Sequence, residues 1–253
     1  MNNVDREPES VKQARESFNH VLNSEKYTDI IQDGGHLGLL LDLAGDGGYK
    51  SILDIGTGNG YLAFPLAEKF PSAHVCGIDI ADEAVERNSA LARERGIGNL
   101  SFRAFDGLRY PFEEGSFDLI VTRYAFHHFP KAQDAVFQMS RILSKGGRAL
   151  ISDPMRSPGD RSGLIDDFMR VKRDGHIQFY SSQALDSLFL SGGFRKEAQV
   201  MTDMRFPFPR QAAYAGLYGK LTEKERALYD MTDDNGVIWV NKIRVGNTIF
   251  VKE

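Results

Sequence analysis

The sequence is poor in cysteine and has no long apolar run, and both absences limit where the protein can work. Its 253 residues include a single cysteine, Cys76, so no internal disulfide bond can form. No apolar stretch reaches the roughly 20 residues that a membrane-spanning helix needs. The polar start, MNNVDREPES, lacks the apolar centre of a signal peptide. We therefore expect a cytoplasmic protein that does not insert into a membrane.

An excess of positive charge is also missing. The chain has 31 Lys and Arg residues against 35 Asp and Glu residues, which gives a net charge of −4 at pH 7. Domains that bind nucleic acid usually carry a basic excess, so a nucleic-acid partner is not expected. Hydrophobic residues make up 42% of the sequence, a usual value for a globular protein with a buried core. The oligomeric state stays open.

Short apolar segments alternate with helical segments between residues 51 and 153. The apolar segments are continuous rather than alternating, which is typical of parallel strands covered on both faces. This order predicts an α/β fold with a doubly wound, Rossmann-like sheet. The predicted strands are Ser51–Ile55, His74–Ile80, Leu100–Phe105, Phe117–Thr122 and Arg148–Asp153, and the predicted helices between them are Gly58–Lys69, Asp82–Arg95 and Ala132–Leu143.

The first strand-to-helix turn is rich in glycine. In SILDIGTGNGYLAF, Gly56, Gly58 and Gly60 follow the apolar run at alternate positions. Glycine lets a backbone approach a ligand closely, and free N–H groups at a helix start favour a hydrogen-bond acceptor or an anion. A phosphate-binding P-loop is excluded because no lysine follows the glycines. The dinucleotide pattern GxGxxG also fails, because Tyr61 stands at its third glycine.

Two acidic residues follow later strands at the same predicted edge of the sheet. Asp79 ends the second strand, where a carboxylate can accept hydrogen bonds from both hydroxyls of a ribose. Asp106 follows the third strand and can accept a hydrogen bond from an exocyclic amine such as that of adenine. Ile80 and Phe105 can supply apolar faces for the ring. Together these residues predict an adenosine-type ligand.

Four stretches together resemble the class I S-adenosylmethionine-dependent methyltransferases, above all the ubiquinone/menaquinone C-methyltransferases and small-molecule methyltransferases. They are ILDIGTGNGYLAFPLAEKF, VCGIDIADEAVERNSALA, LSFRAFDGLRYPFEEGSFDLIVTRYAFHHF and QMSRILSKGGRALISDP. The likeness implies S-adenosylmethionine as cofactor, S-adenosylhomocysteine as its product, and a mostly parallel sheet whose last strand, NTIFVKE, is antiparallel. It also implies roles for Gly56, Thr57, Gly58 and Arg123 near the methionine part, Asp79 at the ribose, and Ile80, Asp106 and Gly107 at the adenine.

The chain as a whole is expected to form one domain, 1–253, because no linker is visible. Residues 1–48 predict a helical N-terminal cover, 49–153 the cofactor-binding core, and 154–253 a lid and the C-terminal strands. The charged stretch 154–180 is equally typical of a lid over the acceptor and of a plain surface segment. The later predicted elements are a helix at Ser182–Ser191, a strand at Ala198–Arg205, a helix at 211–231 and one or two strands in GVIWVNKIRVGNTIFVKE.

Two positions depart from the resemblance. Ala81 stands where Ser or Thr often caps the next helix, which would cost about 1 kcal/mol unless Asp82 takes over the cap. Pro65 falls inside the predicted first helix, where a lost hydrogen bond would cost about 3 kcal/mol. Neither residue would take part in the chemistry.

Aromatic and histidine side chains are the candidates near the reacting group. In YAFHHFP, His127 is predicted to face the methyl group and act as a base or substrate contact, with packing as the alternative for it and for His128. A base is needed only if the acceptor carries a proton of high pKa. The adjacent histidines lack metal-ligand spacing, so no metal is expected. Tyr27 is a further candidate for lining the cofactor site.

The predicted activity is transfer of a methyl group to a small molecule through an O, N or C atom. VTRYAF replaces the Asn/Asp-Pro-Pro-aromatic motif that would indicate methylation of DNA, RNA or protein amines. Two alternatives remain open. One is a module that binds the cofactor without catalysis, and the other is an NAD(P)-dependent oxidoreductase, against which Tyr61 argues.

Overall fold

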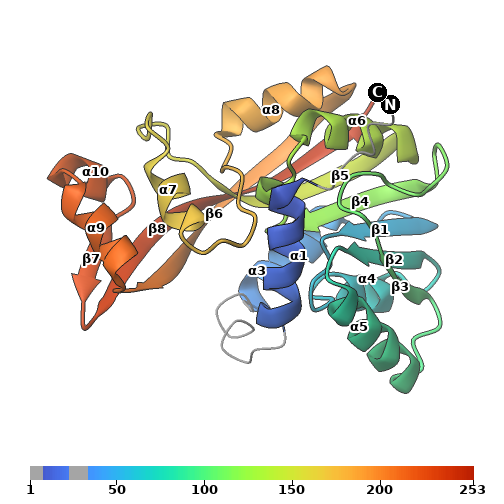
Figure 1. Ribbon diagram of the computed structural model, residues 1–253. Helices are drawn as coiled ribbons and strands as arrows, with labels where there is room; N and C mark the ends of the chain where they lie inside the picture. Colours follow the sequence, from blue (N-terminus) through green and yellow to red (C-terminus); the bar gives the residue numbers. More distant parts are fainter. Residues whose placement is uncertain (1–7, 23–33) are drawn as a thin grey trace, which may run out of the picture.

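The computed structural model describes residues 8–22 and 34–253, and these are arranged around one eight-stranded sheet (Figure 1). The strand order is β3-β2-β1-β4-β5-β8-β6, and β7 pairs with β8 beside this path. The strands are β1 Ser51–Ile55, β2 His74–Asp79, β3 Leu100–Ala104, β4 Phe117–Arg123, β5 Leu143–Met155, β6 Phe194–Pro209, β7 Met231–Asp234 and β8 Val237–Lys252.

The strand directions confirm the predicted fold class. Strands β1 to β5 pair in parallel, whereas β8 runs antiparallel to both β5 and β6. The last strand of the chain is therefore the antiparallel one, as the family resemblance implied. The strand order reverses between β1 and β4, and open α/β sheets bind ligands at the carboxyl ends of the strands at such a point.

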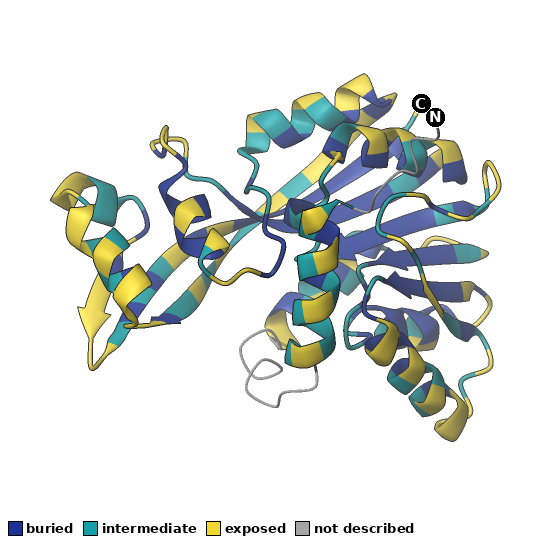
Figure 2. Cartoon of the chain, viewed as in Figure 1, coloured by how far each residue is buried: buried dark blue, intermediate teal, exposed yellow. Residues whose placement is uncertain are grey.

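Helices cover both faces of the sheet. One face packs against α6 and α8, and the other packs against α3, α4 and α5. The first strand is coloured as buried over most of its length in Figure 2. Leu53 belongs to the apolar cluster that includes α6, and Ile52 belongs to the cluster that includes α4. This explains the unbroken apolar character of the strand. The helices are α1 Glu9–Val21, α3 Gly34–Ala44, α4 Ala63–Lys69, α5 Asp82–Glu94, α6 Ala132–Ile142, α7 Leu164–Arg170, α8 Ser182–Ser191, α9 Ala212–Lys220 and α10 Glu223–Ala227, with a 3₁₀ turn, η1, at Phe126–His128.

The first helix after the glycine turn begins later than the sequence predicted. The chain turns through residues 59–62, and α4 starts at Ala63 instead of Gly58. Pro65 is therefore in the first turn of α4, where backbone N–H groups have no partner within the helix. The expected loss of a hydrogen bond at Pro65 does not arise. The other departure stands, because Ala81 caps α5 without a side-chain hydrogen bond.

Strands β6 and β8 continue past the sheet as a long two-stranded ribbon, which carries β7, α9 and α10 (Figure 1). We call residues 203–243, together with α7, the C-terminal extension. It has its own apolar cluster, in which Phe168 of α7 meets Phe208 of β6 and Tyr229 after α10. The extension gives the chain a second core beside the sheet.

The predicted helix at 211–231 was wrong, because the structure divides it. Helix α9 ends at Lys220, and Thr222 then starts α10 with a capping box in which it exchanges hydrogen bonds with Glu225. Such a box is a start signal inside what looked like one helix. The last residue of the predicted helix, Met231, instead begins β7 and pairs with Val240 of β8 in a hairpin that turns at Asn235 and Gly236.

The hydroxyl of Tyr229 joins the C-terminal extension to the loop before α7. It donates a hydrogen bond to Asp160 Oδ2 at 2.8 Å and accepts one from the Ser157 N–H at 3.0 Å. The Tyr229 side chain is almost completely buried. A phenylalanine there would leave the Ser157 donor unsatisfied.

We predict that Tyr229→Phe lowers the free energy of unfolding by about 1–3 kcal/mol, because a buried donor loses its partner. Urea unfolding followed by circular dichroism measures this change. Tyr218→Phe, on the partly exposed side of α9, is the matched control and should change little. Equal unfolding midpoints for Tyr229→Phe and the wild type would show that this hydroxyl does not hold the extension.

Candidate active site

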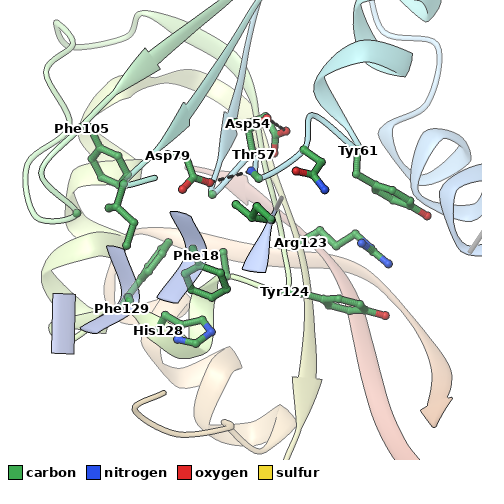
Figure 3. A pocket seen from close by; sticks show the side chains of 18 of the residues that line it. Phe18, Asp54, Thr57, Tyr61, Asp79, Phe105, Arg123, Tyr124, His128 and Phe129 are labelled. Carbon is green, nitrogen blue, oxygen red and sulfur yellow. Dashed lines mark hydrogen bonds between the residues drawn. The ribbon is translucent and has the colours of Figure 1, made fainter. Parts of the chain in front are cut away.

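A pocket opens at the carboxyl ends of β1, β2 and β4, where the strand order reverses (Figure 3). It holds about 1050 Å³ of empty space, part of it open to solvent. The glycine turn, the end of β2, the loop after β3, the end of β4 and the turn η1 form its base and sides, and α1 covers it. The sequence-predicted residues that line it are Gly56, Thr57, Gly58, Asp79, Ile80, Phe105, Gly107 and Arg123.

The glycine turn is held against the end of β2 by backbone hydrogen bonds. The N–H groups of Gly56 and Thr57 both donate to the Ile78 carbonyl, at 2.9 and 3.1 Å. Gly56 has a φ of 72°, and a Cβ there would collide with Ala125, which follows β4. Only glycine combines this left-handed backbone with so close an approach.

The carboxylate of Asp79 bridges two backbone segments at the pocket floor. Oδ2 accepts from the Gly58 N–H at 2.8 Å, and Oδ1 accepts from the Ala81 N–H at 2.9 Å. Burial raises the pKa of this carboxyl, while the backbone hydrogen bonds act in the opposite direction. Each carboxylate oxygen has a further lone pair, so Asp79 can accept two more hydrogen bonds from a ligand.

Asp54, on β1, also lines the pocket, although the sequence analysis did not select it. Its side chain is 2% exposed, and Oδ2 accepts a 2.7 Å hydrogen bond from the Thr57 hydroxyl. Burial raises the pKa of Asp54 to about 7, and the nearby Asp79 also raises it. The position of Asp54 inside the motif DIGTG, two residues before the first glycine, was the available signal.

Arg123 ends β4 between two aromatic rings. Its guanidinium carbon lies 3.9 Å from the ring centroid of Tyr61 and 4.0 Å from that of Tyr124, and both rings also line the pocket (Figure 3). Such stacking holds a guanidinium in place and leaves its charge available at the ring edges. The contact also explains Tyr61, which the sequence showed only as a missing third glycine.

Helix α1 covers the pocket with apolar side chains. Val11, Ala14, Phe18 and Leu22 lie on one stripe of the helix and face the cavity. The Arg15 Nε donates a hydrogen bond to the Ile80 carbonyl at 3.2 Å, which ties α1 to the edge of the sheet. The sequence predicted this helix as cover but gave no reason to name its residues as ligand contacts.

The two histidines of η1 have different surroundings. Of these two described residues, His128 lines the pocket and His127 does not. His127 Nδ1 lies 3.0 Å from Asp153 Oδ1, and the His127 ring packs edge-on against Phe179 with 4.9 Å between centroids. Burial lowers the pKa of both histidines well below the usual value, so both imidazoles are neutral at pH 7. The structure therefore brings His128, rather than the selected His127, to the site.

Asp106 and Tyr27, which the sequence predicted as cofactor contacts, are not among the described residues that line the pocket. Asp106 is exposed, and its Oδ1 accepts hydrogen bonds from the Leu108 and Arg109 N–H groups at 2.8 and 2.7 Å. These two bonds shape the loop after β3. Tyr27 lies outside the described residues. Its role and the adenine role of Asp106 stay predictions.

Comparison with known proteins agrees with this geometry. Residues 48–186, more than half of the chain, match the family described as "Methyltransferase domain". The chain belongs to this methyltransferase family. The match covers β1 to β5 and every part of the pocket lining except α1 and Leu22, while most of the C-terminal extension lies outside it.

Two curated relatives share about a third of their aligned residues with the chain. An uncharacterized methyltransferase, YcgJ, from Bacillus subtilis is 33% identical over 174 residues, which cover 66% of each protein. A demethylmenaquinone methyltransferase from Thermus thermophilus is 34% identical over 125 residues, which cover 49% of this chain and 56% of the relative. The chain thus spans between about half and two thirds of the length of these relatives.

A solved structure shows the same fold. The crystal structure of the YcgJ protein superposes with a TM-score of 0.74 at 23% identity, over 87% of this chain and 99% of the other. Residues 8–22 and 34–253 contain no group of three or more histidine, cysteine or acidic side chains that could hold a metal ion. The same residues contain no helix that is long and apolar enough to cross a bilayer.

The raised pKa of Asp54 predicts a pH dependence of stability. The unfolded chain releases the Asp54 proton near pH 4, whereas the folded chain keeps it until about pH 7. Unfolding therefore releases a proton in this window, and the contribution of Asp54 to stability falls as pH rises, by roughly 1 kcal/mol per pH unit. Asp54→Asn removes this contribution.

We expect Asp54→Asn to gain stability relative to the wild type steadily between pH 4 and pH 7, with a constant difference above that range. Urea unfolding at half-unit pH intervals, without added ligand, measures the difference. Asp134→Asn, at an exposed site of α6, is the control because its carboxylate lies away from the pocket. Parallel stability curves for wild type and Asp54→Asn would contradict a buried, protonated Asp54.

Proposed function

We propose that this protein transfers a methyl group from S-adenosylmethionine to a small-molecule acceptor. The observation that carries the proposal is the buried Asp79 carboxylate beside the glycine turn, inside a pocket at the point where the strand order reverses. Membership of the methyltransferase family supports the reaction type. The relative from Thermus thermophilus, whose name specifies a quinone, supports an acceptor that is not a protein or a nucleic acid.

The residues of the pocket fit each part of S-adenosylmethionine. Asp79 would accept hydrogen bonds from the ribose hydroxyls, and the apolar side chains of Ile80 and Phe105 would cover the adenine ring. Asp54, buried beside the glycine turn, suits the cationic amine of the methionine part. The guanidinium of Arg123 suits its carboxylate. Charged side chains thus match the two charges of the methionine part, and apolar side chains match the adenine ring.

When bound, S-adenosylmethionine would supply a methyl group already activated by its sulfonium charge. The work left to the protein is alignment of the acceptor and exclusion of water. Helix α1 would exclude water by placing Val11, Ala14 and Phe18 across the pocket. We assign the contact with the acceptor, predicted for His127 from sequence, to His128, because His128 faces the pocket. Its neutral imidazole can accept a hydrogen bond from the acceptor.

The two alternatives make different demands on the site. An NAD(P)-dependent oxidoreductase would need a glycine at the third position for close packing of helix on strand, and this position instead holds Tyr61, whose ring supports Arg123 at 3.9 Å. A module that only binds the cofactor would use the same Asp79. His128 favours catalysis over that module, because it is not assigned to ribose or adenine recognition. We also propose a cytoplasmic location, which the free, buried Cys76 supports.

We predict that Asp79→Ala weakens binding of S-adenosylmethionine by at least about tenfold, because two hydrogen bonds to a charged group are lost. Isothermal titration calorimetry measures the dissociation constant. Asp82→Ala, at the exposed start of α5, is the matched control and should bind like the wild type. An unchanged dissociation constant for a folded Asp79→Ala variant would remove the ribose assignment and with it the main support for the proposed function.

A further inference from the structure

A second cavity lies beside α1, between this helix and the C-terminal extension. It has about 830 Å³ of empty space, part of it open to solvent. Its walls come from the last turns of α1, from the segment after α7, from the FPFP stretch of β6 and from the start of α9. We call it the second cavity. None of the interactions described for the cofactor pocket uses it, apart from one shared residue.

The wall contributed by the extension is aromatic. Phe206, Phe208 and Tyr214 all line the second cavity, and the ring centroids of neighbouring pairs are 5.1 and 5.0 Å apart. Prolines precede and follow Phe208 in the same wall. Rigid aromatic walls favour a flat aromatic occupant, which can stack on or meet the edges of the rings.

Phe18 is the partition between the two cavities, because it lines both. On its far side, its ring stands edge-on to the His128 ring, with 5.1 Å between centroids and 89° between planes. Nδ1 of His128 is buried and has no hydrogen-bond partner among the described residues. Figure 3 shows Phe18 lying directly beside His128 in the pocket. Phe18 therefore stands between the second cavity and the His128 ring.

The second cavity also holds a polar pair. Lys172 Nζ lies 3.0 Å from Asp174 Oδ2 and 4.7 Å from the centroid of the Phe206 ring, and all three residues line the cavity. The pair offers a donor and an acceptor at the edge of an aromatic wall. It suits an oxygen substituent, hydroxyl or carbonyl, on an aromatic ring. A purely hydrocarbon occupant would leave the pair without a contact.

The second cavity is lined mostly by residues outside the range that matches the family. Helix α1 and residues 206–214 lie outside the matched range 48–186, whereas most of the cofactor pocket lies within it. Helix α1 also packs closely on the segment after α7, because a Cβ on Gly175 would collide with the Ser10 carbonyl. Segments outside the matched range thus form most of this site, and Lys172 and Asp174 of its lining lie inside the range.

We propose that the second cavity binds the methyl acceptor and that this acceptor is a flat aromatic molecule with at least one oxygen substituent. The ring lies against the aromatic wall of the extension, and the oxygen to be methylated points past Phe18 toward Nδ1 of His128. This inference rests on the proposed function, because it places the acceptor relative to the cofactor pocket. It adds the binding site and the chemical class of the acceptor.

The test uses 2-naphthol as probe and the full-length protein saturated with S-adenosylhomocysteine, so that the cofactor pocket is filled. Ser17 faces the second cavity from α1, and Ser17→Trp fills that space. Glu16→Trp is the matched control, because it adds the same indole to the solvent side of the same helix, where the Glu16 side chain is 69% exposed. Isothermal titration calorimetry measures the dissociation constants of 2-naphthol and of S-adenosylhomocysteine. 2-Decalol, the fully saturated analogue of 2-naphthol, tests whether the occupant must be aromatic.

We expect saturable binding of 2-naphthol to the loaded wild type and to Glu16→Trp. Ser17→Trp should weaken it by at least about tenfold, because the indole occupies the site, with S-adenosylhomocysteine affinity kept within about twofold. Absence of 2-naphthol binding, equal affinity for Ser17→Trp, or 2-decalol binding as tight as 2-naphthol would overturn the proposal. Failure of S-adenosylhomocysteine to bind the wild type would instead overturn the proposed function, so the two failures are distinguishable.

Discussion

The site depends on one interaction, the pair of backbone hydrogen bonds that the Asp79 carboxylate accepts. Through Gly58 it holds the glycine turn, and through Ala81 it holds the start of the segment that leads into α5. These two segments come from neighbouring parallel strands, so a single side chain fixes the floor of the pocket where β1 and β2 end. The Asp79 carboxylate is buried, and burial raises its pKa. The pKa therefore depends on the charges and donors that bind beside it.

Other elements of the fold enclose this floor. Helix α1 covers it with an apolar stripe and is tied to it by Arg15, and the turn η1 brings His128 to its side. The C-terminal extension has a separate core and stands next to α1, on the side away from α5 (Figure 1). The matched part of the chain thus supplies most of the cofactor pocket, while parts outside the match supply its α1 cover and most of the second cavity.

Secondary structure was predicted correctly where the apolar pattern is local and ends at a turn residue. Strand Ser51–Ile55 and helix Ser182–Ser191 were predicted with the observed bounds, because each apolar pattern ends at glycines. The helix predicted at 211–231 failed at its end because β7 and β8 form a hairpin around Asn235 and Gly236, both of which have a positive φ. The Asn-Gly pair is a local turn signal that the apolar spacing alone does not take into account.

The candidate site shows the same division between local and long-range information. Gly56 and Asp79 could be selected because their chemistry follows from being at strand ends. The choice between His127 and His128 could not, because two adjacent residues differ only in the direction that a short 3₁₀ turn gives them, and packing of His127 against Phe179 decides it. Asp106 was selected for its position after β3, but its carboxylate faces the backbone of its own loop.

The most direct test of the central claim is thermal unfolding of the protein with S-adenosylmethionine, S-adenosylhomocysteine, NAD and NADP in parallel. A ligand present at 100 times its dissociation constant stabilises the folded state by about 2.7 kcal/mol, which raises the melting temperature by a few degrees for a chain of this size. The account predicts stabilisation by the two sulfur compounds and none by NAD or NADP. Stabilisation by NAD or NADP alone would contradict it, because the glycine turn and Asp79 would then serve a dinucleotide.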